Sequence, residues 1–197
     1  MGKIIYLMGK SASGKDTIYK ELIDRQELQL QTFPIYTTRP IRDGEHDGVE
    51  YFFTDHQGYQ DLKDQGKVVE ERIYHTMQGD WIYFTVLDGI ADLEHQNYLM
   101  IGTLESYCKI RDKIGKEKLL PIYITLEDGE RLFRALSRER AQENPQYPEL
   151  CRRFLADNED FSEEHIRKAG IGDAEIFDNI DLQKCLLQIM KYLKQNL

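Results

Sequence analysis

The most constraining feature of this 197-residue chain is a short apolar run that leads directly into a glycine-rich loop. Ile4–Met8 has the character of a buried strand, and residues 9–17 spell Gly-Lys-Ser-Ala-Ser-Gly-Lys-Asp-Thr. Gly9 and Gly14 permit close backbone approach, so the backbone N–H groups of the loop can form an anion nest at the start of a helix. Lys15 adds a cation that can reach the β- and γ-phosphates of a nucleoside triphosphate.

The residue after Lys15 departs from the usual form of such a loop, in which Lys is followed by Ser or Thr. A carboxylate is a hard oxygen ligand, so Asp16 is a candidate ligand for the Mg²⁺ that accompanies a triphosphate, with Thr17 as the alternative. The simpler interpretation is an ordinary Gly/Ser turn in which Asp16 caps a helix. The candidate triphosphate-binding residues are Gly9, Ser11, Ala12, Ser13, Gly14, Lys15, Asp16 and Thr17.

Composition narrows the class of protein. With 41% hydrophobic and 31% charged residues, the chain has the values of a single globular domain. It contains no run of about 18 apolar residues and its first strand follows Met1 closely, so we expect neither a membrane span nor a signal peptide. Three widely spaced cysteines favour a reducing, cytoplasmic setting, without a disulfide framework or a zinc site. The net charge of −9 argues against non-specific binding of nucleic acid.

Apolar strands alternate with helical patterns in the outer parts of the chain, which predicts an α/β fold with a parallel sheet flanked by helices. The middle part is β-rich and predicts an inserted lobe. Pro121 is expected where its strand begins, because proline lacks an N–H donor. The predicted strands cover residues 4–8, 33–38, 49–54, 68–69, 81–86, 98–101, 119–125 and 175–177. The predicted helices cover residues 17–28, 55–65, 89–96, 104–114, 128–141, 150–165 and 182–194.

A second motif lies between residues 36 and 53. Arg39 and Arg42 stand three residues apart across a proline, and Tyr51 follows nine residues later. Guanidinium groups match phosphate oxygens, and a phenol can add a further donor, so this segment is a candidate site for a phosphate monoester. Taken alone, it could equally be a solvated loop.

The two motifs together resemble the guanylate kinase family, whose members are P-loop nucleoside-monophosphate kinases. The family pattern Thr-Thr-Arg-x-x-Arg-x-Gly-Glu-x-x-Gly-x-x-Tyr-x-Phe is matched without a gap over residues 37–53. The resemblance implies a core of residues 1–36, 88–126 and 166–197, a GMP-binding lobe of residues 37–87, and a helical lid of residues 127–165. It also implies transfer of the γ-phosphoryl group from ATP to GMP or dGMP, with Mg²⁺ accompanying the ATP.

The resemblance also implies roles for individual side chains. Glu70 stands where the family has the carboxylate that accepts hydrogen bonds from guanine, although alone it could be an ordinary strand-end acid. Some lid arginines could equally form ion pairs along their own helix, such as Glu130–Arg134. The implied GMP-binding residues are Arg39, Arg42, Tyr51, Glu70, Tyr83 and Thr85. The implied catalytic residues are Lys15, Arg134, Arg138 and Arg153, and Asn179 is implied to lie near the adenine of ATP.

The chain departs from the family in the segment after its third apolar strand. The family usually has Leu-Asp-Ile-Asp-x-Gln-Gly there, whereas residues 99–105 are Leu-Met-Ile-Gly-Thr-Leu-Glu, in which Thr103 or Glu105 could substitute for an aspartate. Phe84 replaces the glycine that usually separates the tyrosine and the hydroxyl residue. Asp16 could compensate for the lost carboxylate near Mg²⁺.

Two other functions stay open. One is a kinase of the same fold that acts on another nucleotide or on a ribose phosphate, which the missing aspartates favour and Glu70 disfavours. The other is a non-catalytic binding module with this fold, which the retained Lys15 and both loop glycines disfavour. The sequence does not indicate an oligomeric state.

Overall fold

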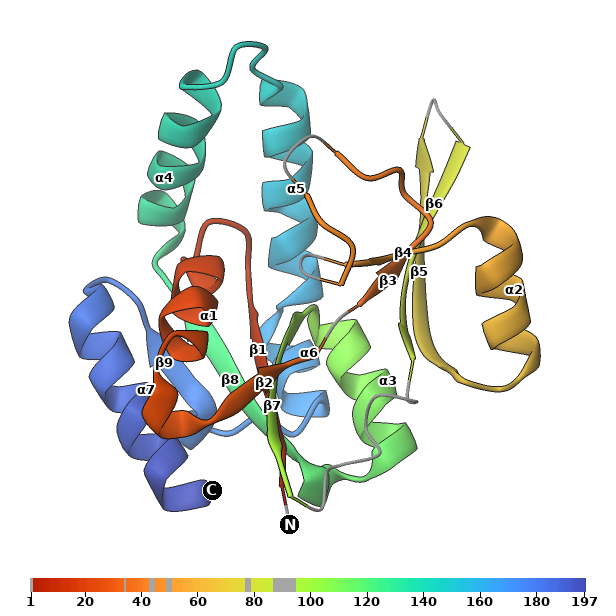
Figure 1. The fold of residues 1–197 in the computed structure, drawn as a ribbon. Coiled ribbons are helices and arrows are strands. Elements are labelled where there is room, and N and C mark those ends of the chain that lie inside the picture. Colours follow the sequence, from red (N-terminus) through yellow and green to blue (C-terminus); the bar gives the residue numbers. More distant parts are fainter. Residues whose placement is uncertain (1, 34, 43–44, 49–50, 77–78, 87–94) are drawn as a thin grey trace.

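A computed structural model of the chain describes residues 2–33, 35–42, 45–48, 51–76, 79–86 and 95–197. Five parallel strands form its central sheet, in the order β2-β7-β1-β8-β9 (Figure 1). This arrangement confirms the predicted α/β class. The strands are β1 (Ile4–Gly9), β2 (Leu30–Thr32), β7 (Asn97–Gly102), β8 (Leu119–Thr125) and β9 (Ile176–Asp178).

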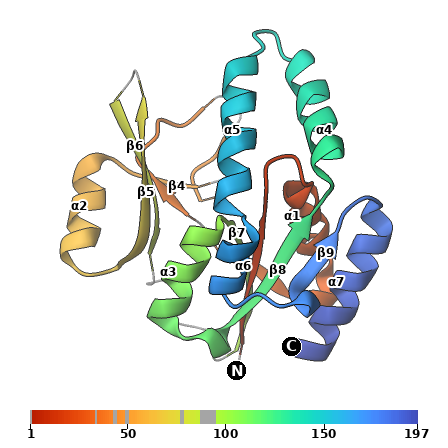
Figure 2. The same cartoon turned by 180° about the vertical axis from the view of Figure 1, so that it is seen from behind.

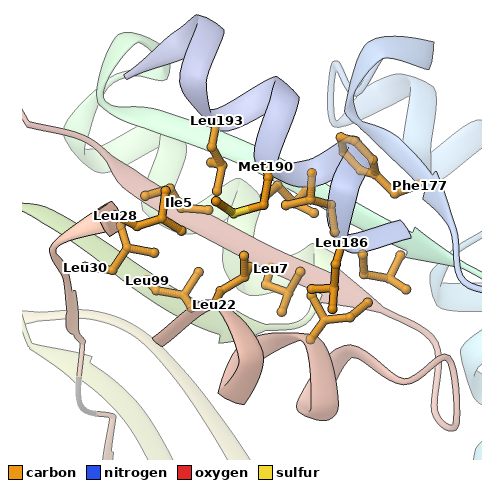
Figure 3. Packing of buried hydrophobic residues seen from close by; sticks show 14 of the residues in the cluster. Ile5, Leu7, Leu22, Leu28, Leu30, Leu99, Phe177, Leu186, Met190 and Leu193 are labelled. Carbon is orange, nitrogen blue, oxygen red and sulfur yellow. The ribbon is translucent and has the colours of Figure 1, made fainter. Parts of the chain in front are cut away.

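Both faces of the central sheet are covered, which explains why β1 is apolar at successive positions. Ile5 and Leu7 point to the face packed by α1 (Lys15–Ile23) and α7 (Leu182–Asn196), as Figure 3 shows. Ile4, Tyr6 and Met8 point to the other face of the sheet and pack with α3 (Leu104–Ile114). The view from behind in Figure 2 shows α3 on that face. The side chains of residues 4–8 are fully buried as a result.

A second, four-stranded sheet has the order β4-β3-β6-β5. The helix α2 (His56–Asp64) covers its outer face (Figure 1), where Ile82 and Phe84 pack against Tyr59. Side chains alternate along a strand, so the neighbours of Phe84 point to the inner face, toward the rest of the molecule. The strands are β3 (Tyr36–Thr37), β4 (Phe52–Phe53), β5 (Val68–Thr76) and β6 (Gly79–Val86).

Two long helices extend beyond the carboxyl ends of the central strands (Figures 1 and 2). They are α4 (Asp128–Arg140) and α5 (Tyr147–Asp160), and α6 (Glu163–Lys168) follows them. The loop after β1 also lies at this end, so α4 and α5 contact it. Within the described part of the chain, no helix combines the length and apolar character needed to cross a membrane.

Several predicted elements need correction. The predicted strand 33–38 is shorter than expected, because only Tyr36–Thr37 pairs as a strand, in the small sheet. The strand Leu30–Thr32, which pairs in the central sheet, was not predicted. The predicted helix 150–165 is two helices, since α5 ends at Asp160 and Ser162 caps α6. The predicted strands 68–69 and 81–86 are parts of one longer hairpin.

The remaining boundaries differ more modestly. The predicted helix 17–28 begins at Lys15 and ends at Ile23, before a short 3₁₀ turn. Pro121 is the third residue of β8, tolerated because β9 pairs only from Tyr123 onward. Most of the predicted helix 89–96, and part of the predicted strand 49–54, lie outside the described residues.

Candidate active site

The loop between β1 and α1 has a left-handed backbone at two positions. Ala12 has φ 62° and Gly14 has φ 88°, and α1 begins at the next residue. At the start of the loop, a Cβ on Gly9 would lie 2.6 Å from the carbonyl oxygen of Ile124 on the neighbouring strand β8. Only glycine therefore lets the loop leave β1 at this point, and the loop leads straight into a helix N-terminus.

Asn179 supports this loop from the end of β9. Its Nδ2 donates to the carbonyl oxygen of Ser13 at 2.8 Å, and a Cβ on Gly14 would collide with the same amide group. Asn179 Oδ1 is buried without a hydrogen-bond partner among the described residues. A small cavity of about 120 Å³ lies beside it, lined also by Thr17 and Arg134. An acceptor is thus available at the edge of the loop.

A large cavity of about 810 Å³ opens beside the loop. Lys15 and Asp16 line it, with Lys15 Nζ 3.7 Å from Asp16 Oδ2, and the Asp16 side chain is 75% exposed. Tyr51 lines the same cavity from the small sheet, and Arg153 lines it from α5. The cavity therefore brings residues of both sequence motifs together, and its other lining residues include Gly9, Ser11, Arg72, Tyr74, Gly102, Thr103 and Asp157.

A buried arginine ties the loop to the two long helices. Arg131 has a side chain only 1% exposed, and its guanidinium lies over the ring of Phe154. It donates to the carbonyl oxygen of Ser11 at 3.3 Å and to Asn158 Oδ1 at 3.1 Å. Asp157 lies 3.6 Å from Arg131 and accepts from the Ser11 backbone N–H at 2.6 Å. An anionic oxygen therefore already sits at one amide of the loop.

Three further arginines reach the same region from α4 and α5. Arg134 donates to Glu130 Oε1 at 2.8 Å, the helix pair anticipated from the sequence, and to the carbonyl oxygen of Asn179 at 3.4 Å. Arg153 Nη2 donates to Ser11 Oγ at 3.2 Å, and Arg138 lines a cavity of about 50 Å³ next to that serine. The structure places the three arginines that were implied to be catalytic close to the loop.

The arginine pair of the second motif has two different surroundings. Arg42 is exposed, whereas Arg39 is buried. Arg39 forms a bidentate ion pair with Glu45, in which Nη2 donates to Oε1 at 2.8 Å and Nη1 to Oε2 at 3.0 Å. Hydrogen bonds from Arg39 lower the pKa of the Glu45 carboxyl. Arg39 Nε also donates to the Tyr83 hydroxyl at 3.1 Å, and its guanidinium lies over the Tyr51 ring. Burial raises the pKa of Tyr51. These contacts pre-organise the phenols around Arg39.

The inner face of the β5–β6 hairpin carries the predicted base-reading residues. Glu70 pairs with Thr85 across the hairpin, and Thr85 Oγ1 donates to Glu70 Oε1 at 2.8 Å. Arg72, two residues along on the same face, places Nε 3.3 Å from Glu70 Oε2. Glu71 points to the opposite face, where Lys63 of α2 lies 2.8 Å from it. Glu70 is thus a buried, inward-facing acid rather than a solvated strand end.

Comparison with known proteins agrees with this geometry. The guanylate kinase family model matches residues 1–152 of the chain. The chain belongs to the guanylate kinase family. The guanylate kinase of Malacoplasma penetrans is 27% identical over 125 residues, which are 62% of each chain. That of Campylobacter jejuni strain RM1221 is 28% identical over 142 residues, 68% of this chain and 64% of the relative. The matches therefore span less than two thirds of these guanylate kinases.

The fold is also that of a guanylate kinase. The crystal structure of guanylate kinase from Anaplasma phagocytophilum superposes with a TM-score of 0.66. The match covers 98% of this chain and 85% of that one, at 18% sequence identity. The likeness therefore extends past residue 152, over the segment that the family model leaves unmatched.

Three site residues of this guanylate kinase family member were not identified by the sequence motifs. Arg131 lies among other arginines on α4, and only its spacing from Asp128, three residues earlier, hints at a pair. Arg72 shares the strand face of Glu70, so the alternation of side chains along β5 could have identified it. Asp157 had no local signal, because its contact with the loop joins residues 146 positions apart.

The structure explains why Gly102 replaces an acidic residue of the usual family pattern. A Cβ at Gly102 would collide with the Tyr6 hydroxyl, which is fully buried and hydrogen-bonded to Ser106. The Thr103 side chain is already used to cap α3, since its hydroxyl accepts a hydrogen bond from the Ser106 backbone N–H in a capping box. Glu105 instead pairs with Lys109 at 2.7 Å.

This crowding predicts a non-additive pair of substitutions. Gly102→Ala should lower the free energy of unfolding by about 2 kcal/mol, because the new methyl overlaps the Tyr6 ring and hydroxyl. In a Tyr6→Leu background, the same change should cost less than half as much, because the phenol is gone. Urea unfolding of the four proteins measures this coupling. Equal costs in both backgrounds would contradict the steric explanation.

Proposed function

We propose that this chain transfers the γ-phosphoryl group of ATP to GMP. The observation that carries the proposal is the cavity of about 810 Å³ that joins Lys15 of the glycine-rich loop to Tyr51 of the small sheet. A donor triphosphate at Lys15 and an acceptor phosphate at Tyr51 would lie in the same cavity, as in-line transfer requires. Membership of the guanylate kinase family supports the same reaction.

The donor side uses the loop and its neighbours. The backbone N–H groups of Ala12, Gly14 and Lys15, with the N-terminus of α1, would hold the β- and γ-phosphates, since the N–H of Ser11 already donates to Asp157 and that of Ser13 to Lys10. Lys15 would place its charge on the oxygens that become more negative during transfer. The free Oδ1 of Asn179 is suited to accept from the exocyclic amine of adenine.

The residues present fit Mg²⁺ bound together with ATP. Mg²⁺ keeps several waters and needs only one or two carboxylates besides the substrate phosphates. Asp16 offers one exposed carboxylate beside Lys15, in the position where a hydroxyl is usual. When bound there, the ion would neutralise charge on the β- and γ-phosphates.

The arginines of α4 and α5 would stabilise the transferring group. Arg134, Arg138 and Arg153 lie around the loop, where their charges could offset those on the γ-phosphoryl oxygens and their closure could exclude water. We infer that residues 127–165 act as a lid and residues 37–87 as a GMP lobe. Both would close on the core of residues 1–36, 88–126 and 166–197.

The acceptor side uses the small sheet. Arg39, Arg42 and Tyr51, with the Tyr83 hydroxyl, would hold the GMP phosphate, for which guanidinium groups and phenols supply matching donors. Thr85 and Glu70 would face the base, because one carboxylate can accept from both guanine N1–H and N2–H₂. The ion pair between Arg39 and Glu45 leaves Arg42 as the more accessible cation.

A second candidate is phosphorylation of another nucleotide or a ribose phosphate on the same machinery. It is favoured by the guanidinium of Arg72 against Glu70 and by Gly102, which leaves no acidic side chain at that position. A non-catalytic module is disfavoured by the built loop and by the arginines around it.

The deciding experiment measures ADP release from MgATP with GMP, dGMP, IMP, AMP, CMP, UMP and ribose 1-phosphate as acceptors. Turnover with GMP that Arg42→Ala reduces strongly would support the proposal. Turnover only with another acceptor would keep the mechanism and replace the substrate. ATP binding without any turnover would favour the binding module.

Asp16 offers a test of the metal site. Asp16→Ala should raise the Mg²⁺ concentration for half-maximal transfer at least about tenfold, since partners of a bound metal usually contribute that much. Asp24→Ala, at the exposed far end of the same helix, should leave it unchanged. A normal Mg²⁺ titration for Asp16→Ala would remove Asp16 from the metal site.

A further inference from the structure

The unusual feature of the acceptor pocket is a guanidinium that covers the carboxylate expected to read the base. The Glu70 side chain is 1% exposed and does not line the large cavity, whereas Arg72 lines it. Arg72 Nε lies 3.3 Å from Glu70 Oε2, and its Nη2 lies 3.5 Å from Oε1. Both carboxylate oxygens therefore face the same edge of Arg72.

The Nε–Nη2 edge of Arg72 resembles the part of guanine that Glu70 would bind in its place. The N1–C2–N2 part of guanine is itself a guanidine unit, with two parallel N–H donors. The Nε–Cζ–Nη2 part of arginine presents the same pair of donors to a carboxylate. Thr85 Oγ1 already donates to Oε1 from the other side. A guanine and Arg72 therefore cannot occupy the two-oxygen edge of Glu70 together.

The hydrogen-bond geometry between Arg72 and Glu70 is poor, so a ligand with better-aligned donors could displace Arg72. Glu70 Oε2 and Arg72 Nε are both buried, and neither has a well-directed hydrogen bond among the described residues. Buried polar atoms without good hydrogen bonds are costly, so a ligand that offers better-aligned donors to Oε2 gains free energy. Arg72 is partly exposed to the cavity, at 17%, and can swing into it.

We propose that Arg72 is a specificity-determining residue that competes with guanine for Glu70 and weakens the binding of GMP. This inference rests on the proposed function, because it assumes that the base of the acceptor enters at Glu70. Removing the guanidinium frees both carboxylate oxygens for guanine N1–H and N2–H₂. AMP has no such donor pair, so its binding does not depend on this edge.

The test is calorimetric titration of GMP and AMP, without ATP, into the wild type, Arg72→Ala and Arg72→Lys. Lysine keeps a charge near Glu70 but cannot cover both oxygens, so it controls for loss of the cation. We expect the Kd for GMP to fall at least about tenfold in Arg72→Ala and to fall in Arg72→Lys, since hydrogen bonds to charged groups are worth that much. The Kd for AMP should stay within about twofold.

The outcomes separate the two proposals. If GMP binding is unchanged or weaker in both folded variants, or if GMP and AMP shift together, Arg72 does not compete with guanine. Thermal melting confirms that each variant is folded. If Arg72→Ala binds GMP more tightly but no variant releases ADP from MgATP and GMP, the specificity role stands and the kinase function fails. If the wild type phosphorylates GMP and Arg72→Ala gains no affinity for GMP, the kinase function stands and the specificity role of Arg72 fails.

Discussion

Replacement of Lys15 by methionine should reduce phosphoryl transfer by about 10²–10³-fold, the usual effect of removing one group that stabilises transition-state charge. Lys15 is the first residue of α1 and lines the large cavity, with its side chain 19% exposed and its ammonium 3.7 Å from the Asp16 carboxylate. Methionine keeps the length of the side chain and removes the charge. The loss should therefore fall mainly on kcat.

The measurement is ADP release at saturating MgATP and GMP, together with ATP binding. Lys184→Met is the matched control, because Lys184 lies on α7 with its side chain 82% exposed. It should retain wild-type turnover. A Lys15→Met protein with more than about a tenth of wild-type turnover would show that the cation is not needed for transfer.

Replacement of Arg131 by methionine should lower the free energy of unfolding by about 3 kcal/mol. Breaking a buried ion pair on one side typically costs about 3–5 kcal/mol, and the lower end applies because Asp128 is half-exposed. The change leaves Asp157 without its cation and the Ser11 carbonyl without a donor. Because Arg131 joins the glycine-rich loop to α4 and α5, turnover should fall as well.

Arg152 provides the control for this prediction. It also lies in the helical pair, but its side chain is 64% exposed and pairs with Glu149 on its own helix. Arg152→Met should change the free energy of unfolding by less than about 0.5 kcal/mol, as expected for a surface ion pair. Urea unfolding of both variants compares the two sites. A similar small loss in both would mean that the buried network contributes little.

The glycine-rich loop between β1 and α1 could be predicted from the sequence because its determinants are local. Gly9, Gly14 and Lys15 lie in one short loop, close together in the sequence. The strand before this loop and the helix after it can be predicted from the pattern of apolar residues. The same holds for α3 and β8, whose boundaries agree with those predicted from apolar spacing and turn signals. Fold class followed from the alternation of such elements.

Prediction was weaker wherever pairing partners decide the structure. Residues 30–37 change from one sheet to the other within a few positions, and an extended propensity does not say which sheet a residue joins. The break between α5 and α6 was likewise hidden, because helical spacing continues across it while Ser162 restarts the hydrogen-bond pattern.

The sequence by itself determined the glycine-rich loop between a strand and a helix, the family and the α/β class, because these depend on residues that are neighbours in the chain. Only the tertiary structure decided what surrounds the chemical groups. It placed Asp157 on the Ser11 amide, buried Arg131 between two helices, and put Arg72 against Glu70 in an ion pair without a well-directed hydrogen bond to Glu70 Oε2. The physical reason is that burial and charge pairing depend on distances through space.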